Sequence, residues 1–390
     1  MNKLPSDWQI KTINEVCNIY TGNSINKKKK EENFIGLKEG LNYIGTKDIS
    51  FNNIIEYENG VKIPFKDLKD FKIAKSNTSL LCIEGGSAGR KIGFTNQDVC
   101  FGNKLCCFEA IEDEPKFIYF YLQSNYFLRE FNSNIQGLIG GVNKENLRKI
   151  KIPIPPLDEQ KRIASALSKI DAYLENTIKL IEEKERFKRG IAKKLLTCKE
   201  GENIPEARFK GFEGKWETKA LNSISNIKKG EQKNKLDLIA DGKYPVLNGG
   251  MNFSGYCNSY NREANTITIS EGGNAGYVNF IKEKFWSSGH CYTLHDLKID
   301  KYFLYQCLKN SEKRLMKLQL GTALKNIRQS EIVEFELNIP KSIKEQEKIG
   351  GYLSLLDEEI DNLKKQKELI KEMKRGAMQK LLSGEVRLLE

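Results

Sequence analysis

Two long segments with a heptad pattern constrain the fold of this 390-residue chain more than any other feature. Residues 158–196 form the first segment, and residues 345–382 repeat its pattern 186 positions later. Each segment keeps an apolar a/d repeat over five heptads, which predicts a coiled-coil helix roughly 57 Å long at about 1.5 Å per residue. The predicted seam consists of Ile163, Leu167, Ile170, Leu174, Ile181, Leu195, Ile349, Leu353, Leu356, Ile360, Leu363, Ile370 and Leu381.

An apolar strip this narrow must pack against another helix, and its own duplicate is the nearest candidate. We therefore expect the two helices to form an antiparallel coiled coil between two domains, a dumbbell with a pseudo-twofold axis. Lys188 and Lys374 occupy equivalent seam positions, where their stems can stay buried while their ammonium groups reach water. The alternative is that both helices belong to one ordinary helical core, although helices in such cores are usually far shorter.

The breaks between these segments predict the domain order. A chain of this length exceeds one typical core, so at least two domains are expected. We predict a first domain at 1–157, a helix at 158–198, a linker at 199–212, a second domain at 213–343, and a helix with its tail at 344–390. The linker is polar and contains Gly201, Pro205 and Gly211 as breakers. Repeats of this length indicate duplicated domains rather than solenoid units.

Composition restricts the class of protein. The formal net charge is +12, and most of the excess lies outside the two helices, which suggests a polyanionic partner. Nine cysteines without a Cys-x-x-Cys pair fit reduced thiols in a cytoplasmic protein. Only His290 and His295 are present, which argues against a histidine-based zinc site, and we expect no bound metal. No run of the sequence reaches membrane-spanning length.

A glycine-rich loop occurs once in each half. Glu84 to Gly89 follows the apolar run Leu80 to Ile83, and Glu271 to Gly276 follows Thr266 to Ser270. The expected structure is a β-hairpin whose glycines permit positive φ. A nucleotide-binding P-loop is excluded because no choice of glycines gives its spacing. The loop either presents backbone amides and polar side chains to nucleic acid or is a purely structural turn.

Two further pairs of segments repeat. Phe117 to Leu122 aligns with Tyr302 to Cys307, and we interpret this aromatic stripe as core rather than as a base-stacking surface. Gln136 to Asn143 aligns with Gln319 to Asn326, and these small residues suit either a loop close to DNA or an ordinary turn. Lys27 to Lys30 predicts an exposed loop, either solvated or in contact with phosphates. The candidate DNA-binding residues are Lys27, Lys28, Lys29, Lys30, Ser87, Arg90, Lys91, Gln136, Asn143, Lys228, Lys229, Lys233, Lys235, Asn274, Lys325, Asn326 and Arg328.

Several motifs together resemble the specificity subunits of type I restriction–modification systems. They are the domain openings at Trp8 and Trp216, the two glycine-rich loops, Ile152 to Gln160 running into Ile163, Pro205 to Phe212, and Leu381 to Gly384. The resemblance covers nearly the whole chain, and the order of the motifs is more specific than any one of them. Pro340 to Lys344 departs from the family pattern, because it lacks the double proline at 155–156.

The resemblance implies two target-recognition domains of α/β (α+β) fold, each reading one half of a split double-stranded DNA site. The paired helices would act as a spacer and, by their exposed faces, as the docking surface for two DNA adenine methyltransferase subunits. Those subunits would bind S-adenosylmethionine, and restriction and translocase subunits would use ATP and Mg. No cofactor is expected on this chain.

Two rival functions remain open from the sequence. Enzymatic activity in the chain itself would need a catalytic motif, but Ile154 to Leu157 lacks the amide and aromatic residues of an adenine methyltransferase motif. Glu159-Gln160-Lys161 resembles a metal-nuclease element, yet its repeat at 345–347 has no lysine. The second rival is a coiled-coil adaptor with protein-binding end domains. Binding to duplex DNA that weakens steeply with salt would distinguish a DNA reader from such an adaptor.

Overall fold

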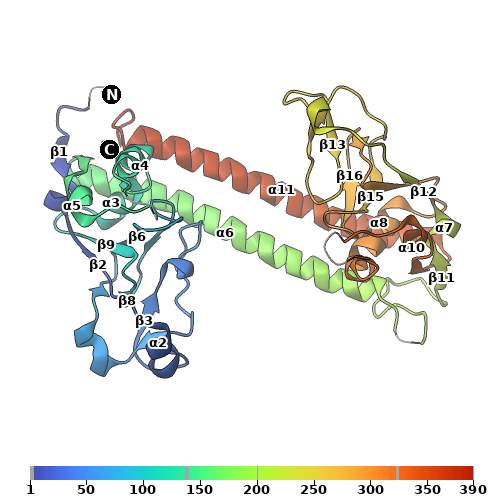
Figure 1. The fold of residues 1–390 in the computed structure, drawn as a ribbon, viewed down its shortest axis with the longest axis horizontal. Coiled ribbons are helices and arrows are strands. Elements are labelled where there is room, and N and C mark those ends of the chain that lie inside the picture. Colours follow the sequence, from blue (N-terminus) through green and yellow to red (C-terminus); the bar gives the residue numbers. More distant parts are fainter. Residues whose placement is uncertain (1–3, 137–139, 200, 322–324, 390) are drawn as a thin grey trace. The chain divides into compact units, whose positions relative to one another are not determined.

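Each heptad segment forms one continuous helix. The computed structural model describes residues 4–136, 140–199, 201–321 and 325–389. Helix α6 spans Leu157–Leu196 and helix α11 spans Ile343–Leu381 (Figure 1). The chain divides into unit 1, Met1–Thr177 with Gln366–Glu390, and unit 2, Ile178–Lys365. Each unit therefore contains part of both long helices.

Unit 1 is built on two four-stranded sheets. The first has the antiparallel order β2-β9-β6-β7 and consists of β2 (Cys17–Thr21), β9 (Leu105–Ala110), β6 (Ser79–Cys82) and β7 (Ile92–Phe94). The second has the order β4-β3-β8-β5, with β4 (Lys62–Ile63), β3 (Leu41–Ile44), β8 (Val99–Phe101) and β5 (Ile73–Ala74). A separate pair joins β1 (Gln9–Thr12) to β10 (Lys151–Ile154). The short helices are α1 (Ile13–Val16), α2 (Lys27–Asn33), α3 (Pro115–Tyr121), α4 (Asn125–Ser133) and α5 (Lys144–Lys149), with 3-10 turns at Thr46–Asp48 and Phe65–Asp70.

Unit 2 repeats the four-stranded antiparallel sheet and the separate strand pair of unit 1, and its other sheet has three strands. Its four-stranded antiparallel sheet has the order β12-β18-β15-β16 and consists of β12 (Asn226–Lys229), β18 (Cys291–His295), β15 (Thr266–Ser270) and β16 (Val278–Ile281). A three-stranded sheet contains β14 (Gly255–Cys257), β13 (Tyr244–Leu247) and β17 (Trp286–Ser287), and β11 (Glu217–Ala220) pairs with β19 (Glu336–Ile339). The shorter helical elements are α7 (Leu221–Ile224), a 3-10 turn (Lys235–Asp237), α8 (Lys301–Asn310), α9 (Glu312–Met316) and α10 (Gln329–Val333). The α+β class expected from the sequence is confirmed, with one such domain in each unit.

Each domain packs its core onto segments of both long helices. In unit 1, Phe117 of α3 and Leu147 of α5 share a buried cluster with Leu167 of α6 and Leu381 of α11. In unit 2, Phe303, Trp216 and Leu353 share a buried cluster with Leu195. Burying one Leu or Phe side chain contributes about 1.5–3 kcal/mol, so these contacts hold each domain to its helices.

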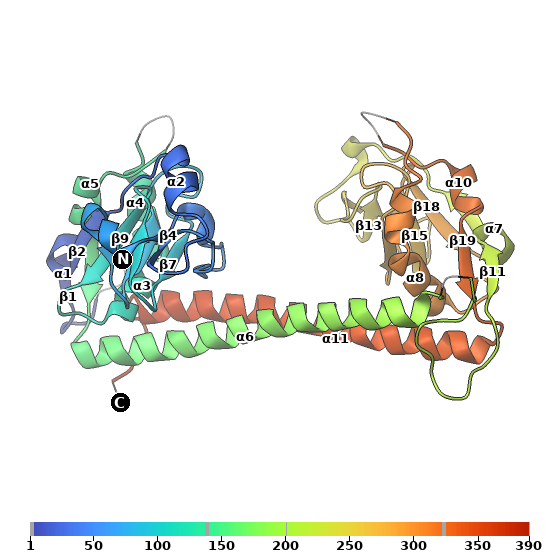
Figure 2. The ribbon, with the colours of Figure 1, turned by 90° about the horizontal axis from the view of Figure 1, so that it is seen from below.

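Within each unit the helix segments run antiparallel. In unit 1, Tyr173 and Asp171 of α6 contact Gln366 and Lys374 of α11, so rising numbers on one helix meet falling numbers on the other (Figure 2). The predicted seam residues Ile163, Leu167, Ile181, Leu195, Ile349, Leu353, Leu356, Ile360, Ile370 and Leu381 are buried, and Ile170, Leu174 and Leu363 are partly buried. The seam lysines differ from expectation, because their ammonium groups meet carboxylates rather than water. Lys374 Nζ lies 2.7 Å from Asp171, and Lys188 Nζ lies 2.5 Å from Asp357.

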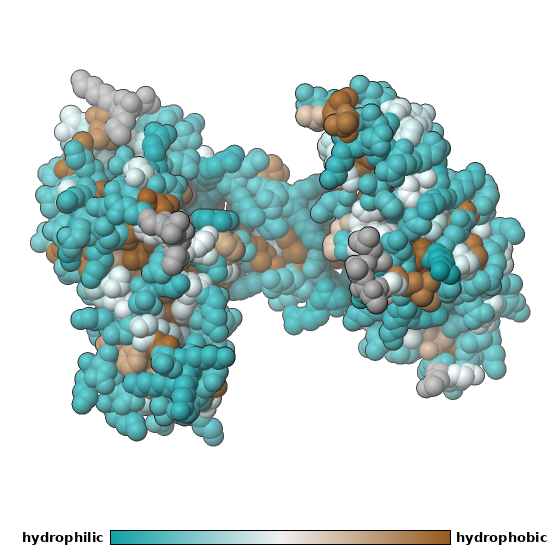
Figure 3. Space-filling model, in the orientation of Figure 1, coloured by the Kyte–Doolittle hydropathy of each residue, from teal (hydrophilic) through white to brown (hydrophobic). Residues whose placement is uncertain are grey.

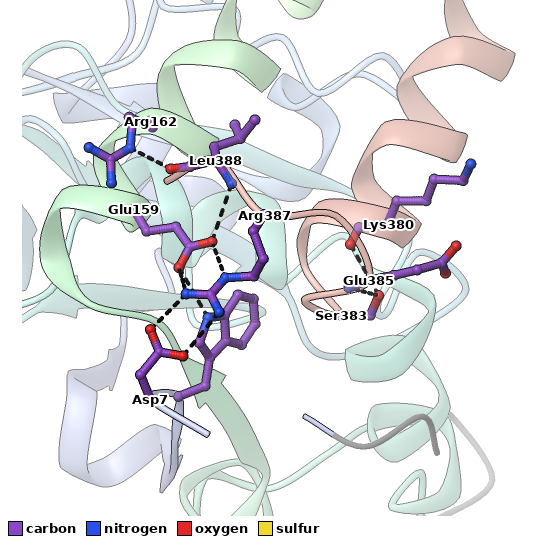
Figure 4. A network of polar contacts seen from close by, with 9 residues as sticks. Asp7, Glu159, Arg162, Lys380, Ser383, Glu385, Arg387 and Leu388 are labelled. Atoms are coloured by element: carbon purple, nitrogen blue, oxygen red, sulfur yellow. Dashed lines mark hydrogen bonds and ion pairs between the residues drawn. The ribbon is translucent and has the colours of Figure 1, made fainter. Parts of the chain in front are cut away.

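A buried glutamate fixes the start of each long helix. Glu159 is 1% exposed; its carboxylate accepts hydrogen bonds from Trp8 Nε1 at 3.1 Å and from Arg387 Nε and Nη2 at 2.7 Å each (Figure 4). Arg387 also donates to both carboxylate oxygens of Asp7, at 3.0 and 2.7 Å. Trp8 opens the domain and Arg387 lies beyond α11, so three distant parts of the sequence meet at one carboxylate.

The same arrangement recurs in unit 2 with an arginine from the linker. Glu345 accepts from Trp216 Nε1 at 3.3 Å and from Arg208 Nε and Nη2 at 2.8 and 2.7 Å. Arg208 also donates to the backbone carbonyls of Glu213 and Gly214. A buried carboxylate is costly unless it is paired and hydrogen-bonded, and both glutamates meet that condition.

The glutamine after each glutamate aligns the two repeats. Gln160 Oε1 accepts from the backbone N–H of Glu114, and Gln346 Oε1 accepts from that of Asp300, both at 2.9 Å. These residues cap α3 and α8, so Phe117 corresponds to Phe303. The predicted alignment of Phe117 with Tyr302 is therefore wrong by one residue, because a run of aromatic residues does not fix its own register. The prediction that this stripe is core is confirmed in the first copy, where Phe117 to Tyr121 are all buried. In the second copy Phe303, Leu304 and Cys307 are buried, but Tyr302 is 43% exposed.

Candidate nucleic-acid interface

The glycine-rich segments form the hairpin loops expected from the sequence. Strand β6 pairs antiparallel with β7, and β15 pairs antiparallel with β16. Gly85 and Gly89 in the first loop, and Gly273 and Gly276 in the second, have φ between +70° and +86°. A Cβ on Gly276 would also lie 2.9 Å from the backbone nitrogen of Met316. The last glycine of the loop is therefore required both by its backbone angle and by close packing.

In each unit a second loop lies against the glycine-rich loop. In unit 1 the backbone N–H of Gly85 donates to Gly140 O at 2.8 Å, and Val142 N donates to Ile83 O at 3.0 Å. In unit 2 Ile327 N donates to Glu271 O at 2.9 Å. The structure thus brings together predicted loops that are far apart in the sequence. Gly137, Leu138 and Ile139, and residues 322–324, fall outside the described residues.

The closing pairs of the second loop correct its alignment. Gln136 and Gly141 exchange backbone hydrogen bonds at 2.8 and 3.1 Å, and Leu320 and Asn326 do the same at 2.8 and 3.1 Å. Gln136 therefore corresponds to Leu320 rather than to Gln319, and Asn326 corresponds to Gly141 rather than to Asn143. The two loops differ in length by one residue, which an ungapped comparison of the sequences does not reveal.

Two predicted residues of this loop lie at helix starts. Asn143 is the N-cap of α5, and its Oδ1 accepts from the backbone N–H of Asn146 at 2.8 Å. Arg328 occupies the N-cap position of α10, and its side chain is exposed. Lys325 and Gln136 are exposed beside them. The amide of Asn143 therefore has a structural role, whereas the other three side chains project from the loop.

The run of four lysines forms a helix, not the loop that the sequence suggested. Lys27 to Lys30 lie in α2, which is capped by Asn26, whose side chain accepts from the backbone N–H of Lys28. Lys27 and Lys28 lie 3.9 Å from Glu31 and Glu32 one turn later, and these i,i+4 pairs relieve part of the repulsion among the lysines. All three of Lys27, Lys28 and Lys29 are exposed, as expected, and Lys30 is partly buried.

Cations beside the first glycine-rich loop flank an exposed aromatic ring. Arg90 and Lys91 lie 5.2 and 4.9 Å from the centre of the Phe51 ring, which is 61% exposed. Lys91 Nζ also donates to Thr46 O at 3.0 Å, and Ser87 is partly buried in the loop. Phe51 lies in the turn after the 3-10 turn Thr46–Asp48, and nothing in the sequence pattern distinguishes an exposed phenylalanine there from a core residue.

Of the four lysines predicted near β12, Lys229 contacts the second glycine-rich loop. Lys229 Nζ lies 2.6 Å from Glu271 Oε1, and Lys233 Nζ lies 3.7 Å from the centre of the Trp286 ring. Lys228 is exposed on β12, and Lys235 begins the 3-10 turn after it. Lys229 is therefore already paired with the residue that opens the loop.

Residues that the sequence did not flag complete this site in unit 2. His290 Nδ1 lies 3.5 Å from Glu271 Oε2, and Tyr292 OH donates to Glu271 Oε1 at 2.9 Å. Burial and the neighbouring Glu271 carboxylate raise the pKa of Tyr292, so it remains a donor. Asn248 Oδ1 is buried without a hydrogen-bond partner, in the Asn248-Gly249-Gly250 turn that follows β13. The two consecutive glycines of that turn are the sequence feature from which Asn248 could have been selected.

Short backbone approaches join this turn to the rest of the site. A Cβ on Gly249 would lie 2.8 Å from Gly272 O and 2.9 Å from His290 O, and one on Gly272 would lie 2.5 Å from Asn326 Oδ1. A Cβ on Gly250 would lie 3.7 Å from Asn274 Nδ2. Three asparagines and His290 therefore gather around one glycine-rich loop. Asparagine amides can bond bidentately to adenine edges, while lysine and arginine contact phosphates.

The face of each unit drawn in Figure 3 is mainly hydrophilic. In the part of the chain that the structure describes, no group of three or more His, Cys, Asp and Glu side chains could hold a metal ion. No helix there is both long and apolar enough to cross a membrane. The arrangement of both units is thus one of amide, hydroxyl and cationic groups presented by loops on a rigid sheet.

Comparison with known proteins identifies the family. The profile of the type I restriction modification DNA specificity domain matches twice, at residues 5–183 and 213–372. The chain belongs to this specificity family. The two matches cover both repeats, and the motifs that suggested the family in the sequence lie inside them or in the linker and tail that hold Arg208 and Arg387.

Individual relatives agree with the family. The MjaVIII specificity subunit of Methanocaldococcus jannaschii is 26% identical over 419 residues, covering 99% of this chain and 94% of that protein. S.MpnORF638P of Mycoplasma pneumoniae, a protein proposed to be a type I specificity subunit, is 40% identical over 151 residues. That match covers 38% of this chain and 40% of that protein.

A solved structure shares the fold of this specificity chain. The S subunit of the type I restriction-modification system from M. genitalium superimposes with a TM-score of 0.69 at 20% sequence identity. The superposition covers 98% of this chain and 97% of that one. At this identity the likeness concerns the fold, which is that of two repeated specificity domains with long helices.

Proposed function

We propose that this chain is the DNA-reading subunit of a type I restriction–modification complex, and that its two domains each recognise one half of a split DNA site. The observation that carries the proposal is the double match to the DNA specificity domain, together with the backbone contact of a second loop with the glycine-rich loop in each unit. Phosphate contacts would come from lysines and arginines, and base contacts from the amides around the loops.

Two linked readers explain how short half-sites can give a selective target. When one domain is bound, the other meets its half-site as an intramolecular event at high effective concentration. Each mismatched base pair costs roughly 1–3 kcal/mol, so mismatches in either half weaken the whole complex.

The exposed faces of α6 and α11 would bind two adenine methyltransferase subunits. S-adenosylmethionine would be bound by those subunits, and ATP and Mg by the restriction subunits.

We propose that this chain itself is not catalytic. The segment that resembles a nuclease element contains Glu159, whose carboxylate is held by Trp8 and Arg387 at the start of α6. Glu345 is held in the same way by Trp216 and Arg208. A carboxylate that is 1% exposed and bonded on both oxygens is a structural group, and it is not available to a metal ion or a substrate.

Mapping methylated adenines tests the proposal. The genome of cells that co-express this chain and its methyltransferase should carry a split adenine-methylation motif that disappears when the gene is deleted. Replacing residues 213–343 with the second domain of another family member should change one half of that motif and leave the other half unchanged. The absence of a gene-dependent motif despite an active methyltransferase would refute the proposal.

A further inference from the structure

One position at the start of the glycine-rich loop differs in chemistry between the two domains. Ile83 N donates to Lys104 O at 3.0 Å, and Glu271 N donates to His290 O at 2.9 Å. Each residue also accepts, at 3.0 and 2.9 Å, from a backbone N–H of the loop that lies against it. Glu271 therefore occupies the backbone position of Ile83, which belongs to the buried core of unit 1. Unit 2 has a carboxylate where unit 1 has an apolar side chain.

The residues on the neighbouring strands change together with this position. In unit 1 the buried Cys106 has Thr21 as its cross-strand partner, and in unit 2 Tyr292 has Lys229 as its cross-strand partner. Tyr292 OH donates to Glu271 Oε1 at 2.9 Å, and Lys229 Nζ donates to the same oxygen at 2.6 Å. Ionisable groups are costly inside a domain, so their joint presence in unit 2 points to a functional cluster.

The two oxygens of the Glu271 carboxylate have different surroundings. Oε1 accepts from Lys229 and Tyr292, whereas Oε2 is buried and has no hydrogen-bond partner among the described residues. His290 Nδ1 lies 3.5 Å from Oε2, which is slightly long for a hydrogen bond. Lys229 already supplies the counter-charge of the carboxylate, so Oε2 is left to hold the imidazole ring of His290.

His290 extends from this buried carboxylate toward the surface. Its side chain is 53% exposed, whereas that of Glu271 is 14% exposed. A Cβ on Gly249 would lie 3.3 Å from His290 Cβ, and a Cβ on Gly272 would lie 3.8 Å from His290 Nδ1 and 2.5 Å from Asn326 Oδ1. The two glycines therefore leave room for the ring beside the amide of Asn326.

The contact with Glu271 determines what the imidazole can recognise. A neutral imidazole donates from one ring nitrogen and accepts at the other. When Nδ1–H points at a carboxylate, Nε2 is the acceptor. In the major groove of DNA the hydrogen-bond donors are the exocyclic amino groups, N6 of adenine and N4 of cytosine. Lysine and arginine have no acceptor, so the cations around this loop cannot make that contact.

We propose that His290 reads one base pair of the half-site bound by unit 2, with Nε2 accepting from an exocyclic amino group, and that Glu271 is the positioning residue that orients the ring. This inference rests on the proposed function, because it assigns one contact within DNA recognition. Unit 1 has Lys104 and Ile83 at the equivalent positions, so its half-site is read without this contact.

The test is binding selection from a randomised duplex pool with the full chain. His290→Ala should reduce the preference at one base pair of the half-site bound by unit 2 at least about fivefold, and leave the first half of the motif intact. His290→Gln should keep part of that preference, because its amide oxygen can replace Nε2 as the acceptor. Thermal unfolding of each variant checks that it is folded.

Glu271→Gln should give a result that a merely structural role would not. Lys229 and Tyr292 both donate toward Oε1, so they should retain the amide oxygen, and the new NH₂ group then faces His290 Nδ1. Nδ1 becomes the acceptor, and the ring proton moves to Nε2. The enriched base at the affected position should therefore switch between the amino bases adenine and cytosine and the keto bases guanine and thymine.

The matched control is Glu283→Gln, which removes the same charge from an exposed side chain of unit 2 and should leave the motif unchanged. The same switch in this control would show that the motif responds only to net charge. Loss of affinity for all sequences in Glu271→Gln, without a switch, would make Glu271 a structural residue. A second half-site unchanged by His290→Ala would refute this inference alone. No enriched motif from the unaltered chain would refute the proposed function, and this inference with it.

Discussion

Lys188 Nζ lies 2.5 Å from Asp357 Oδ1, and Lys374 repeats the contact with Asp171 at 2.7 Å. Each lysine side chain is 14% exposed. In both pairs the carboxylate comes from the first half of its helix and the lysine from the second half of the other. A polar pair at a seam position is satisfied in only one register, so these contacts specify the antiparallel pairing within each unit.

Neutralising the aspartate of either pair should destabilise its unit. Asp357→Asn leaves Lys188 partly buried without a counter-charge, and we expect a loss of about 1–2 kcal/mol, less than for a fully buried pair. Asp171→Asn should act alike on unit 1. The control is Glu359→Gln, which breaks a pair with Lys184 whose side chains are 36% and 53% exposed, and should cost less than about 0.5 kcal/mol. Urea denaturation followed by circular dichroism measures all three, and equal losses would contradict the assignment.

Removing Arg387 should destabilise unit 1 more strongly. Arg387→Ala leaves the carboxylate of Glu159 buried without a counter-charge, with Trp8 Nε1 and the Leu388 backbone N–H as donors at 3.1 and 3.4 Å. Breaking such a buried pair costs about 3–5 kcal/mol. Changing Glu159 to Gln in the same chain should recover part of that loss, because the uncompensated charge is gone. Arg208→Ala should have the matching effect on unit 2. Limited proteolysis, with the cleaved units identified by mass spectrometry, would show which unit opens, and opening of the wrong unit would refute this prediction.

Acidic pH should weaken the same contact. Hydrogen bonding to Arg387 lowers the pKa of Asp7 below its ordinary value. Because the folded pKa is depressed, this contribution is present above the ordinary pKa of an aspartate and is lost as pH falls through the lower folded value. We expect the thermal midpoint of the wild-type chain to fall more steeply than that of Asp7→Asn below about pH 4. Parallel curves would show that Asp7 is not involved.

Alanine substitutions in the two glycine-rich loops should differ in their effect on stability according to backbone angle and available space. Gly276→Ala introduces a Cβ at φ +86° against the backbone of Met316, and we expect a cost of about 1–3 kcal/mol or more. Gly86→Ala in the first loop has open space and an ordinary φ, so it should change stability by less than about 0.5 kcal/mol. Thermal unfolding of both variants checks this, and a neutral Gly276→Ala would contradict it.

Amide and lysine substitutions should have different effects on DNA binding. Asn248→Ala or Asn326→Ala should relax the second half of the recognised motif, at about 1–3 kcal/mol, and leave the first half intact. Glutamine in place of Lys27 and Lys28 should weaken binding to all sequences and reduce its salt dependence. Binding selection from a randomised duplex pool, repeated at two salt concentrations, distinguishes the outcomes. Loss of affinity without a change of motif in the asparagine variants would assign them a structural role.

The long helices, the repeated domain order and the hairpin loops were predictable because each depends on a local pattern. An apolar seam at heptad spacing needs a partner helix whatever surrounds it, and a strand followed by glycines predicts a hairpin. The aromatic stripe around Phe117 was predictable as core for the same reason. The domain boundaries and the DNA-contacting residues selected from the sequence stay predictions.

The pairing of charged side chains and the contacts across long stretches of chain were not predictable from these patterns. The lysines of α2 form a helix because Asn26 caps it and because Glu31 and Glu32 offset their charge, which a count of like charges misses. Lys188 finds Asp357 in another part of the sequence. Asn248 and His290 join the candidate site only after two sheets fold, so neither could be selected from its neighbours in the chain.

The contact between Arg387 and Asp7 has a consequence for biosynthesis. During translation, Arg208 emerges shortly before Trp216, and Glu345 follows Arg208 by 137 residues, so unit 2 has its arginine before its glutamate. Unit 1 must wait for some 380 residues to pass between Asp7 and Arg387, roughly 20–80 s at 5–20 residues per second. The domain that is synthesised first is therefore completed last. A nascent chain that stalls in α11 would have an N-terminal domain in which Asp7 and Glu159 still lack Arg387.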